Sequence, residues 1–316
     1  MSRAKMLSVI IPARQEMFLQ KTIENILKNI EADTEIIAIC DGNWPDPPVL
    51  DHPRVIVVHH TESIGQRAAT NEGARISRAK FIMKVDAHCA FGKGFDRILM
   101  EDCQYDWTMI PSQWNLHAFD WKCKACGNLT YQGAKPTVCK KCQSSDFEMV
   151  IVWNDKHTNT VSWRFDSTMH FQYWRKHYKR PECQGDLIET MSCVGACFLM
   201  HRKRFKNLGG MDENHGSWGQ YGTELACKTW LSGGRMITSK KTWYAHMFRT
   251  GNFKGAFGGG SSFPYQISSE AQERAKQYSR DLWLNNKWSK QKYPLKWLVD
   301  KFSPVPGWEG FDWTKV

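Results

Sequence analysis

Buried-strand signals alternate with helical ones through the first 86 residues, and this alternation constrains the fold more than any other feature. The segments are, in order, 7–12, 19–30, 35–42, 54–59, 66–78 and 80–86. Strands that alternate with helices favour a parallel sheet covered on both faces, as in α/β proteins. Because ligands of such sheets bind beyond the carboxyl ends of the strands, Asp41 and Asp86 are candidate site residues.

The second part of the chain is basic and rich in aromatic residues. Residues 1–112 hold 13 basic and 15 acidic residues, whereas residues 113–316 hold 30 and 17, a net charge of +13. Fourteen of the fifteen Trp follow residue 106. Such a composition indicates a polyanionic partner such as single-stranded nucleic acid. The alternative is a solvated basic face over a Trp-rich core.

Cysteine usage and the lack of targeting signals bear on the compartment. No apolar run approaches the roughly 18 residues that cross a bilayer, and the N-terminus lacks the apolar core of a signal peptide. The 11 Cys are therefore interpreted as reduced thiols or metal ligands. We expect a cytoplasmic protein, in the host cytoplasm if the chain is viral.

Four of these cysteines form two CxxC pairs, Cys123-x2-Cys126 and Cys139-x2-Cys142, separated by twelve residues. Four thiolates at this spacing suit a tetrahedral structural zinc, and Gly127 can make the tight turn after the first pair. The alternatives are an iron–sulfur or rubredoxin-type iron site, or four unrelated thiols.

Asp86-Ala87-His88 follows the fourth apolar run. In an extended segment, the side chains of Asp86 and His88 point the same way, so they can share a divalent cation. His246 is a candidate third ligand. By spacing alone, this motif also fits a polar turn.

Several motifs together resemble the family 2 glycosyltransferases and their relatives, the polypeptide N-acetylgalactosaminyltransferases. The resemblance covers about residues 6–112 and 186–250. It rests on the following pieces: the run from Ser8 to Glu16, Asp41, the Gly65, Asn71 and Gly73 pattern, Asp86-Ala87-His88, Gly195 to Phe198, Gly209 to Asp212, Trp218-Gly219, Glu224 to Trp230, Gly233-Gly234 and His246 to Arg249.

The resemblance implies a GT-A fold, a nucleotide-sugar donor, preferably a UDP-sugar, and a metal-dependent transferase. It implies Mn²⁺, or Mg²⁺, held by Asp86, His88 and His246, with Asp86 also counted as catalytic. The donor-binding residues that it implies are Pro12, Arg14, Glu16, Asp41, Arg67, Asp86, Gly195, Trp218 and Arg249. Arg249 and the Gly-rich segment 251–263 are expected to close over the diphosphate.

One departure concerns the catalytic base. Inverting relatives carry a Glu-Asp pair after Trp-Gly, but Tyr221-Gly222 stands there in this chain. Either Glu224 or a carboxylate such as Asp212 substitutes, or the reaction retains the anomeric configuration and needs no such base. We expect retention, with Glu224 as the candidate catalytic carboxylate; Glu224 equally fits a structural residue at a helix start.

The expected organisation has four parts: 1–112, a nucleotide-sugar-binding half; 113–185, a zinc-binding, aromatic and basic acceptor lobe; 186–250, the acceptor and catalytic half; and 251–316, a Gly-rich loop with a helical tail. The expected acceptor is a hydroxymethylated pyrimidine in DNA, with an unstacked base held by aromatics of the lobe. The candidates are Trp163, Phe171, Tyr173 and Trp174 for the base, and Arg164, Arg175, Lys176, Lys179 and Arg180 for phosphates. The alternatives are a polysaccharide, lipid-linked or protein acceptor, and an inactive nucleic-acid-binding module.

Overall fold

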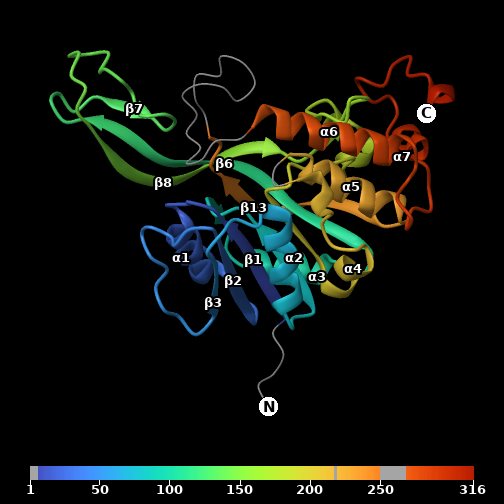
Figure 1. The fold of residues 1–316 in the computed structure, drawn as a ribbon, viewed down its shortest axis with the longest axis horizontal. Helices are drawn as coiled ribbons and strands as arrows, with labels where there is room; N and C mark the ends of the chain where they lie inside the picture. The colour runs from blue at the N-terminus through green and yellow to red at the C-terminus, as the bar shows by residue number, and fades with distance from the viewer. Residues whose placement is uncertain (1–5, 217–218, 250–267) are drawn as a thin grey trace.

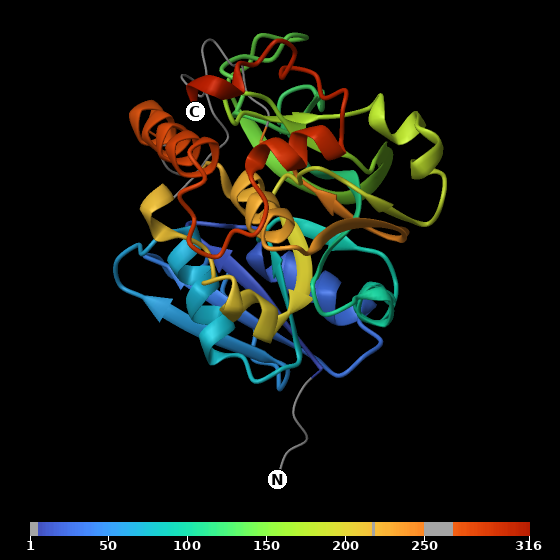
Figure 2. The same ribbon diagram turned by 90° about the vertical axis from the view of Figure 1, so that its right-hand side faces the viewer.

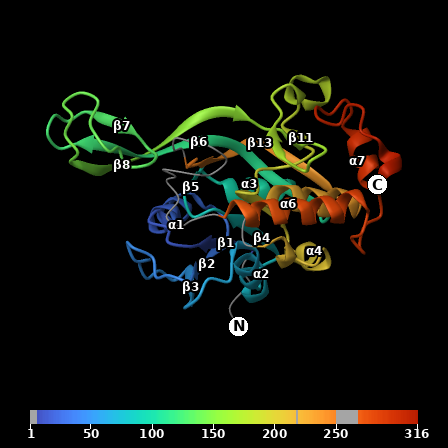
Figure 3. The same ribbon diagram turned by 45° about the horizontal axis from the view of Figure 1, so that its top comes forward.

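The computed structural model describes residues 6–216, 219–249 and 268–316 (Figure 1). Trp218 and the Gly-rich segment 251–263 lie outside the described residues. The described chain forms one large mixed sheet with helices on both faces, and a long arm extends from one end of the sheet (Figures 1 and 3).

The strands are β1 (Leu7–Ala13), β2 (Thr34–Asp41), β3 (Val55–His60), β4 (Phe81–Val85), β5 (Cys89–Phe91), β6 (Trp107–Cys123), β7 (Leu129–Tyr131), β8 (Phe147–Thr160), β9 (Trp163–Phe165), β10 (Phe171–Tyr173), β11 (Leu187–Glu189), β12 (Cys197–His201) and β13 (Arg235–His246). The α-helices are α1 (Leu19–Asn29), α2 (Gln66–Ile76), α3 (Phe95–Asp102), α4 (Arg202–Asn207), α5 (Tyr221–Leu231), α6 (Ser269–Leu284) and α7 (Leu295–Lys301). The short 3-10 helices are η1 (His177–Lys179), η2 (Pro181–Cys183), η3 (Glu213–His215) and η4 (Trp313–Lys315).

The strand order of the main sheet is β11-β13-β6-β12-β4-β1-β2-β3. Strands β4, β1, β2 and β3 run parallel to one another, as the alternation of strands and helices predicts. β12 then joins antiparallel to both β4 and β6, so the second half of the sheet is mixed. The carboxyl ends of β1, β2 and β4 therefore meet at one edge, where β13 also ends.

Each face of β1 belongs to a different core, which explains why this strand is a continuous apolar run. Val9 and Ile11 pack in the cluster that includes α1 and α3, whereas Ile10 packs in the cluster that includes α5 and α7. Helix α2 crosses β1 so closely that a Cβ on Gly73 would lie 2.4 Å from Cγ2 of Ile10. Glycine is thus required there by contact between the helix and the strand.

The arm consists of the distal halves of β6 and β8 with β7 (Figure 3). β6 runs without a break from Trp107 in the main sheet to Cys123 at the arm, so the predicted boundary between residues 112 and 113 falls inside a strand. The C-terminal helices α6 and α7 cover the part of the molecule away from the N-terminal strands (Figures 1 and 2).

The abundance of Trp in the second part serves the core. Trp163, Trp230 and Trp283 are at most 1% exposed, and Trp174 is 4% exposed. All four pack in one cluster with residues of α5, α7 and the tail. These four side chains therefore belong to a Trp-rich core and not to a nucleic-acid-binding surface.

Candidate active site and metal centres

A cavity of about 950 Å³ opens at the carboxyl edge of the parallel strands. Nine residues that sequence reasoning placed at the donor or metal site line it: Pro12, Arg14, Glu16, Asp41, Asp86, His88, Gly195, His246 and Arg249. They come from segments far apart in the chain, and the ends of β1, β2, β4 and β13, with the segment just before β12, bring them together. Trp218 lies outside the described residues.

Asp86, His88 and His246 form the metal-ligand cluster expected from the sequence. His88 Nε2 lies 3.1 Å from His246 Nε2, which lies 3.3 Å from Asp86 Oδ2. The three ligand atoms are all within 4.8 Å of one another. In an octahedral site with bonds of about 2.1 Å, neighbouring ligand atoms lie about 3 Å apart. The donor set and its spacing therefore fit a divalent ion such as Mn²⁺ or Mg²⁺.

Charge and burial keep these groups in the protonation states that a metal needs. Burial opposes ionisation of Asp86, but the Lys84 ammonium and the two histidines together outweigh it and hold the pKa of this carboxyl below its ordinary value. Burial lowers the pKa of His246 to about 4, so its imidazole is neutral at pH 7. Nδ1 of His246 is buried without a hydrogen-bond partner.

Glu16 orients His88 from behind. Its Oε2 lies 2.9 Å from His88 Nδ1 and also accepts a hydrogen bond from Arg249. Burial would raise the pKa of Glu16, but the charges of His88 and Arg249 outweigh that effect and lower it. A carboxylate that accepts from Nδ1 leaves Nε2 as the lone-pair nitrogen, which is the usual support of a metal-binding histidine.

Asp41 has a structural task at the end of β2. Its carboxylate accepts hydrogen bonds from Ser63 Oγ at 2.9 Å, Ile64 N at 2.6 Å and Gly65 N at 3.1 Å. These contacts fix the turn that begins α2 and that lines the cavity. The assignment of Asp41 to donor binding stays a prediction from the resemblance.

Arg67 and Glu224 do not line the cavity, contrary to the roles expected for them. Arg67 is 1% exposed and donates to Glu224 Oε2 at 2.8 Å and to the carbonyls of Gly216 and Gly219. Glu224 is fully buried, and its Oε1 accepts from Asp212 N at 2.6 Å and pairs with Lys228 at 2.7 Å. A carboxylate with this many donors and no path to solvent cannot reach an acceptor hydroxyl, so the geometry does not support Glu224 as the base.

Asp212, the other carboxylate considered as a base, is also engaged. It accepts from Tyr278 at 2.8 Å and caps η3 by accepting from Asn214 N at 3.1 Å. It is not among the residues that line the cavity. Tyr221, which stands where inverting relatives have an acidic residue, does line the cavity, and its hydroxyl donates to Thr70 at 2.9 Å.

Sequence reasoning missed two residues that hold Asp86 in place. Lys84 Nζ contacts Asp86 Oδ1, and Gln66 Nε2 donates to the same oxygen at 3.1 Å. A signal for Lys84 was available, because it precedes Asp86 by two residues in a strand and so shares its face.

The part of the cavity lining away from the strand ends was also missed, except for Phe171, which was expected as an acceptor aromatic. It consists of His170, Phe171, Ser269, Gln272, Glu273 and Lys276. The last four lie on or next to α6, whose sequence shows an amphipathic helix but not where it packs. Tyr278 of α6, hydrogen-bonded to Asp212, helps to place this helix over η3.

Four of the nine residues expected to hold an unstacked base or its phosphates serve as packing and anchoring groups, whereas Arg175, Lys176 and Lys179 are exposed. Trp163 and Trp174 are core residues. Arg180 donates to the carbonyls of Phe302 and Pro304 at 3.0 and 2.8 Å and stacks on Trp174. Arg164 likewise donates to the carbonyl of Pro306. Phe171 is half-buried and Tyr173 is 45% exposed, so these two aromatics remain accessible.

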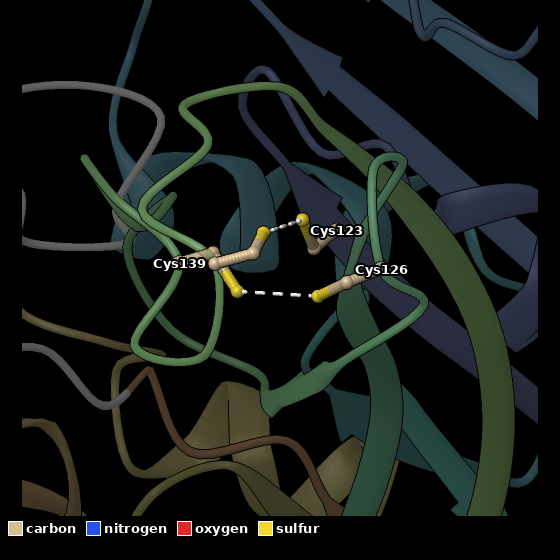
Figure 4. Close-up of side chains that lie close together, drawn as sticks. Cys123, Cys126 and Cys139 are labelled. Carbon is tan, nitrogen blue, oxygen red and sulfur yellow. Dashed lines mark hydrogen bonds between the residues drawn. The ribbon is translucent and has the colours of Figure 1, made fainter.

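The four Cys of the two CxxC pairs meet at the arm (Figure 4). Sγ of Cys123 lies 3.5 Å from that of Cys142, and Sγ of Cys126 lies 3.6 Å from that of Cys139. Four sulfurs around a tetrahedral zinc with bonds of about 2.3 Å are about 3.8 Å apart. The spacing therefore fits one zinc ion.

Both turns at this cluster have the same geometry. Gly127 and Gln143 follow the second Cys of each pair, and both adopt a left-handed backbone, at φ 72° and 61°. Each donates its N–H to the carbonyl of the first Cys. The N–H groups of Lys141 and Cys142 lower the pKa of Cys139 to about 6, which favours the thiolate that a metal binds.

Comparisons with known proteins show which proteins this chain is similar to. Residues 8–115 match the model of the glycosyl transferase family 2. Polypeptide N-acetylgalactosaminyltransferase 6 of Bos taurus is 23% identical over 257 residues, which cover 77% of this chain and 37% of that protein. Polypeptide N-acetylgalactosaminyltransferase 10 of Mus musculus is 34% identical over 84 residues, or 24% of this chain and 14% of that protein. The chain thus spans less than half the length of these relatives.

A solved structure with the same overall fold is the crystal structure of GalNAc-T7 with UDP, GalNAc and Mn²⁺. It superimposes with a TM-score of 0.61 and 17% identity over 89% of this chain and 49% of that one. The predicted GT-A fold, with a four-Cys cluster and helices at the C-terminus, is confirmed. Among the described residues, no helix has both the length and the apolar character to span a membrane.

Proposed function

We propose that this chain transfers a sugar from a nucleotide-sugar donor, preferably a UDP-sugar, to a hydroxyl acceptor, and that the reaction requires a divalent metal. The observation that carries the proposal is the convergence of Asp86, His88 and His246 at the carboxyl edge of a GT-A sheet. The cavity volume of about 950 Å³ is that of a site for a nucleotide-sized ligand.

Each group around the cluster has a part in this reaction. A divalent ion held by Asp86, His88 and His246 would neutralise charge on the leaving diphosphate. Glu16 holds His88 in the tautomer that presents Nε2, and it also holds Arg249 beside the cavity, where a guanidinium can contact a phosphate.

We propose that the reaction retains the anomeric configuration. The carboxylates that line the described cavity are Glu16, Asp41, Asp86 and Glu273. The first three already accept hydrogen bonds or belong to the metal cluster, and Glu273 is an exposed carboxylate on α6 whose Oε2 lies 3.8 Å from Lys276 Nζ. Tyr221-Gly222 replaces the acidic pair of inverting relatives, so no buried, uncommitted carboxylate of the described cavity stands ready as a base.

A polypeptide hydroxyl is our first candidate acceptor, because the relatives named above are polypeptide N-acetylgalactosaminyltransferases. The part of the lining that includes Phe171, Gln272, Glu273 and Lys276 is the proposed acceptor side, since it contains none of the residues expected to bind the donor or the metal. The second candidate is a hydroxymethylated pyrimidine in DNA. The net charge of +13 over residues 113–316 favours a polyanionic acceptor, although the buried Trp163 and Trp174 cannot stack on a base.

We further propose that the four-Cys cluster binds one structural zinc and that the protein acts in a reducing compartment such as the cytoplasm. Nothing at the cluster leaves an open position for a substrate, since all four ligand positions are thiols. All 11 cysteines are free thiols in the structure, which suits such a compartment.

A mass-spectrometric screen tests the function. The full chain is incubated with Mn²⁺ and each of a set of nucleotide sugars, and the acceptors are peptides rich in Ser and Thr, hydroxymethylated DNA, unmodified DNA and glycans. The proposal expects a hexose- or N-acetylhexosamine-sized mass increase on one acceptor class. Labelling of DNA but not of peptides would show that the second candidate acceptor is correct. If no donor gives either sugar transfer or hydrolysis, the proposed function is refuted.

A further inference from the structure

Lys84 is a fully buried cation directly beneath the metal-ligand cluster. Its side chain is 0% exposed, and it is the last residue but one of β4, which lies between β1 and β12. The ammonium contacts Asp86 Oδ1, donates to the Gly195 carbonyl at 2.9 Å and lies 4.8 Å from the centre of the Tyr221 ring. A buried charge is tolerated only when it is paired and hydrogen-bonded, and Asp86 provides that partner here.

This contact divides the two oxygens of Asp86. Oδ1 accepts from Lys84 and from Gln66, whereas Oδ2 faces His246. Only Oδ2 points into the cluster. A metal ion would therefore bind one oxygen of Asp86, a carboxylate whose negative charge is already balanced by the Lys84 ammonium.

The same balance holds behind the cluster. The carboxylate of Glu16 is paired with the guanidinium of Arg249. The ligand set therefore presents almost no net negative charge to a divalent cation, although two carboxylates lie beside it. The missing negative charge would come from the diphosphate of the donor.

This inference rests on the proposed function. We propose that Lys84 is a positioning residue that offsets the charge of Asp86 and thereby makes metal binding depend on the nucleotide diphosphate. Because binding free energies are reciprocal, the metal then strengthens diphosphate binding by the same factor. A metal-free chain keeps its site assembled through the ion pair between Lys84 and Asp86.

The test measures Mn²⁺ affinity directly. Free Mn²⁺ is followed by electron paramagnetic resonance while the full chain is titrated with Mn²⁺ alone and with Mn²⁺ plus saturating UDP. For the wild type, UDP is expected to tighten Mn²⁺ binding by about tenfold or more. Lys84→Gln removes the charge but keeps a donor toward Asp86 and the Gly195 carbonyl. It is expected to bind Mn²⁺ alone about tenfold more tightly and to show a smaller effect of UDP.

Lys80→Met is the matched control, because Lys80 is an exposed lysine just before the same strand, and its Mn²⁺ affinity should equal that of the wild type. Unchanged or weaker binding of Mn²⁺ alone by Lys84→Gln would overturn the role of Lys84, because a purely structural residue gives that result. If this variant fails to fold, equal wild-type affinity with and without UDP would still overturn the inference. If UDP does not bind at any Mn²⁺ concentration, the proposed function is refuted rather than the role of Lys84. The titrations with Mn²⁺ alone then still compare the Mn²⁺ affinities of Lys84→Gln and the wild type.

Discussion

Arg67 on α2 and Glu224 on α5 lie 157 positions apart in the chain and form an ion pair, with Nε 2.8 Å from Oε2, in which neither side chain is more than 1% exposed. The ion pair links α2, whose first turn Asp41 holds in place, to α5, which begins two residues after Gly219. Both residues stood among the candidate site residues, and both now belong to the framework behind the site.

Glu224→Gln is therefore expected to lower stability rather than to remove a catalytic base. Breaking one partner of a buried ion pair costs about 3–5 kcal/mol, because the other charge is left uncompensated. Denaturant unfolding measures this loss, and turnover per folded molecule should stay within a few-fold of the wild type. A normally stable variant that has lost turnover by orders of magnitude would show that Glu224 is catalytic after all.

Glu16→Gln is expected to weaken Mn²⁺ binding by about 10- to 100-fold, because it removes the carboxylate that orients His88. Glu24→Gln, an exposed change on α1, is the control. Calorimetry with Mn²⁺ and UDP measures both affinities. Equal affinities in the two variants would mean that Glu16 does not support the metal site.

Cys126→Ser is expected to lower the zinc content well below one ion per chain and to destabilise the arm, because zinc binding supplies folding free energy. Cys103→Ser, which changes a cysteine outside the cluster, should keep the zinc. Elemental analysis and proteolysis near residues 123–147 read out the two effects. If purified wild-type protein contains no zinc, the zinc assignment is contradicted, whether or not the protein contains iron.

Acidification is expected to destabilise the protein between pH 6.5 and about 4. Burial lowers the pKa of His177 and of His215 to about 4, so the unfolded chain binds protons in this window that the folded chain does not. Stability is then complete above pH 6.5 and falls on acidification by up to about 1.4 kcal/mol per pH unit for each histidine. Unfolding at several pH values checks this, and His177→Asn should flatten the slope. An equal slope in that variant would exclude His177 as a cause.

Glu273→Gln and Lys276→Ala are expected to raise the acceptor KM more than the donor KM, since both residues line the cavity from α6, on the proposed acceptor side. Steady-state kinetics with each substrate varied in turn separates the two effects. A selective rise in the donor KM would show that these residues bind the donor and not the acceptor.

The sequence predicted the first half of the fold well because that half is built from local patterns. The apolar runs and helical spacing gave the order of β1, α1, β2, β3, α2 and β4 with ends within about two residues of those observed. The Asp86-Ala87-His88 motif and the two CxxC pairs were found because their ligands are close in sequence. His246, 158 positions after His88, was a candidate third ligand, and the resemblance supported it, but no local pattern marked it.

The rest depends on contacts between distant segments. Nothing local distinguishes Arg67 or Glu224 as residues of a buried pair, because each partner is set by the packing of α2 against α5. The same is true of α6, whose polar residues become a cavity wall only when Tyr278 meets Asp212. The aromatic residues of 113–185 suggested a nucleic-acid surface because composition does not show which rings are buried.

Release of UDP from a UDP-sugar is the most direct test of the central claim, because it needs the donor site and the metal but no particular acceptor. The account predicts that the full chain hydrolyses at least one UDP-sugar slowly with Mn²⁺, and that EDTA or the double change His88→Ala and His246→Ala reduces the rate by orders of magnitude while the fold persists. Undiminished UDP release in EDTA, or in the double variant, would contradict a metal-dependent transferase centred on Asp86, His88 and His246.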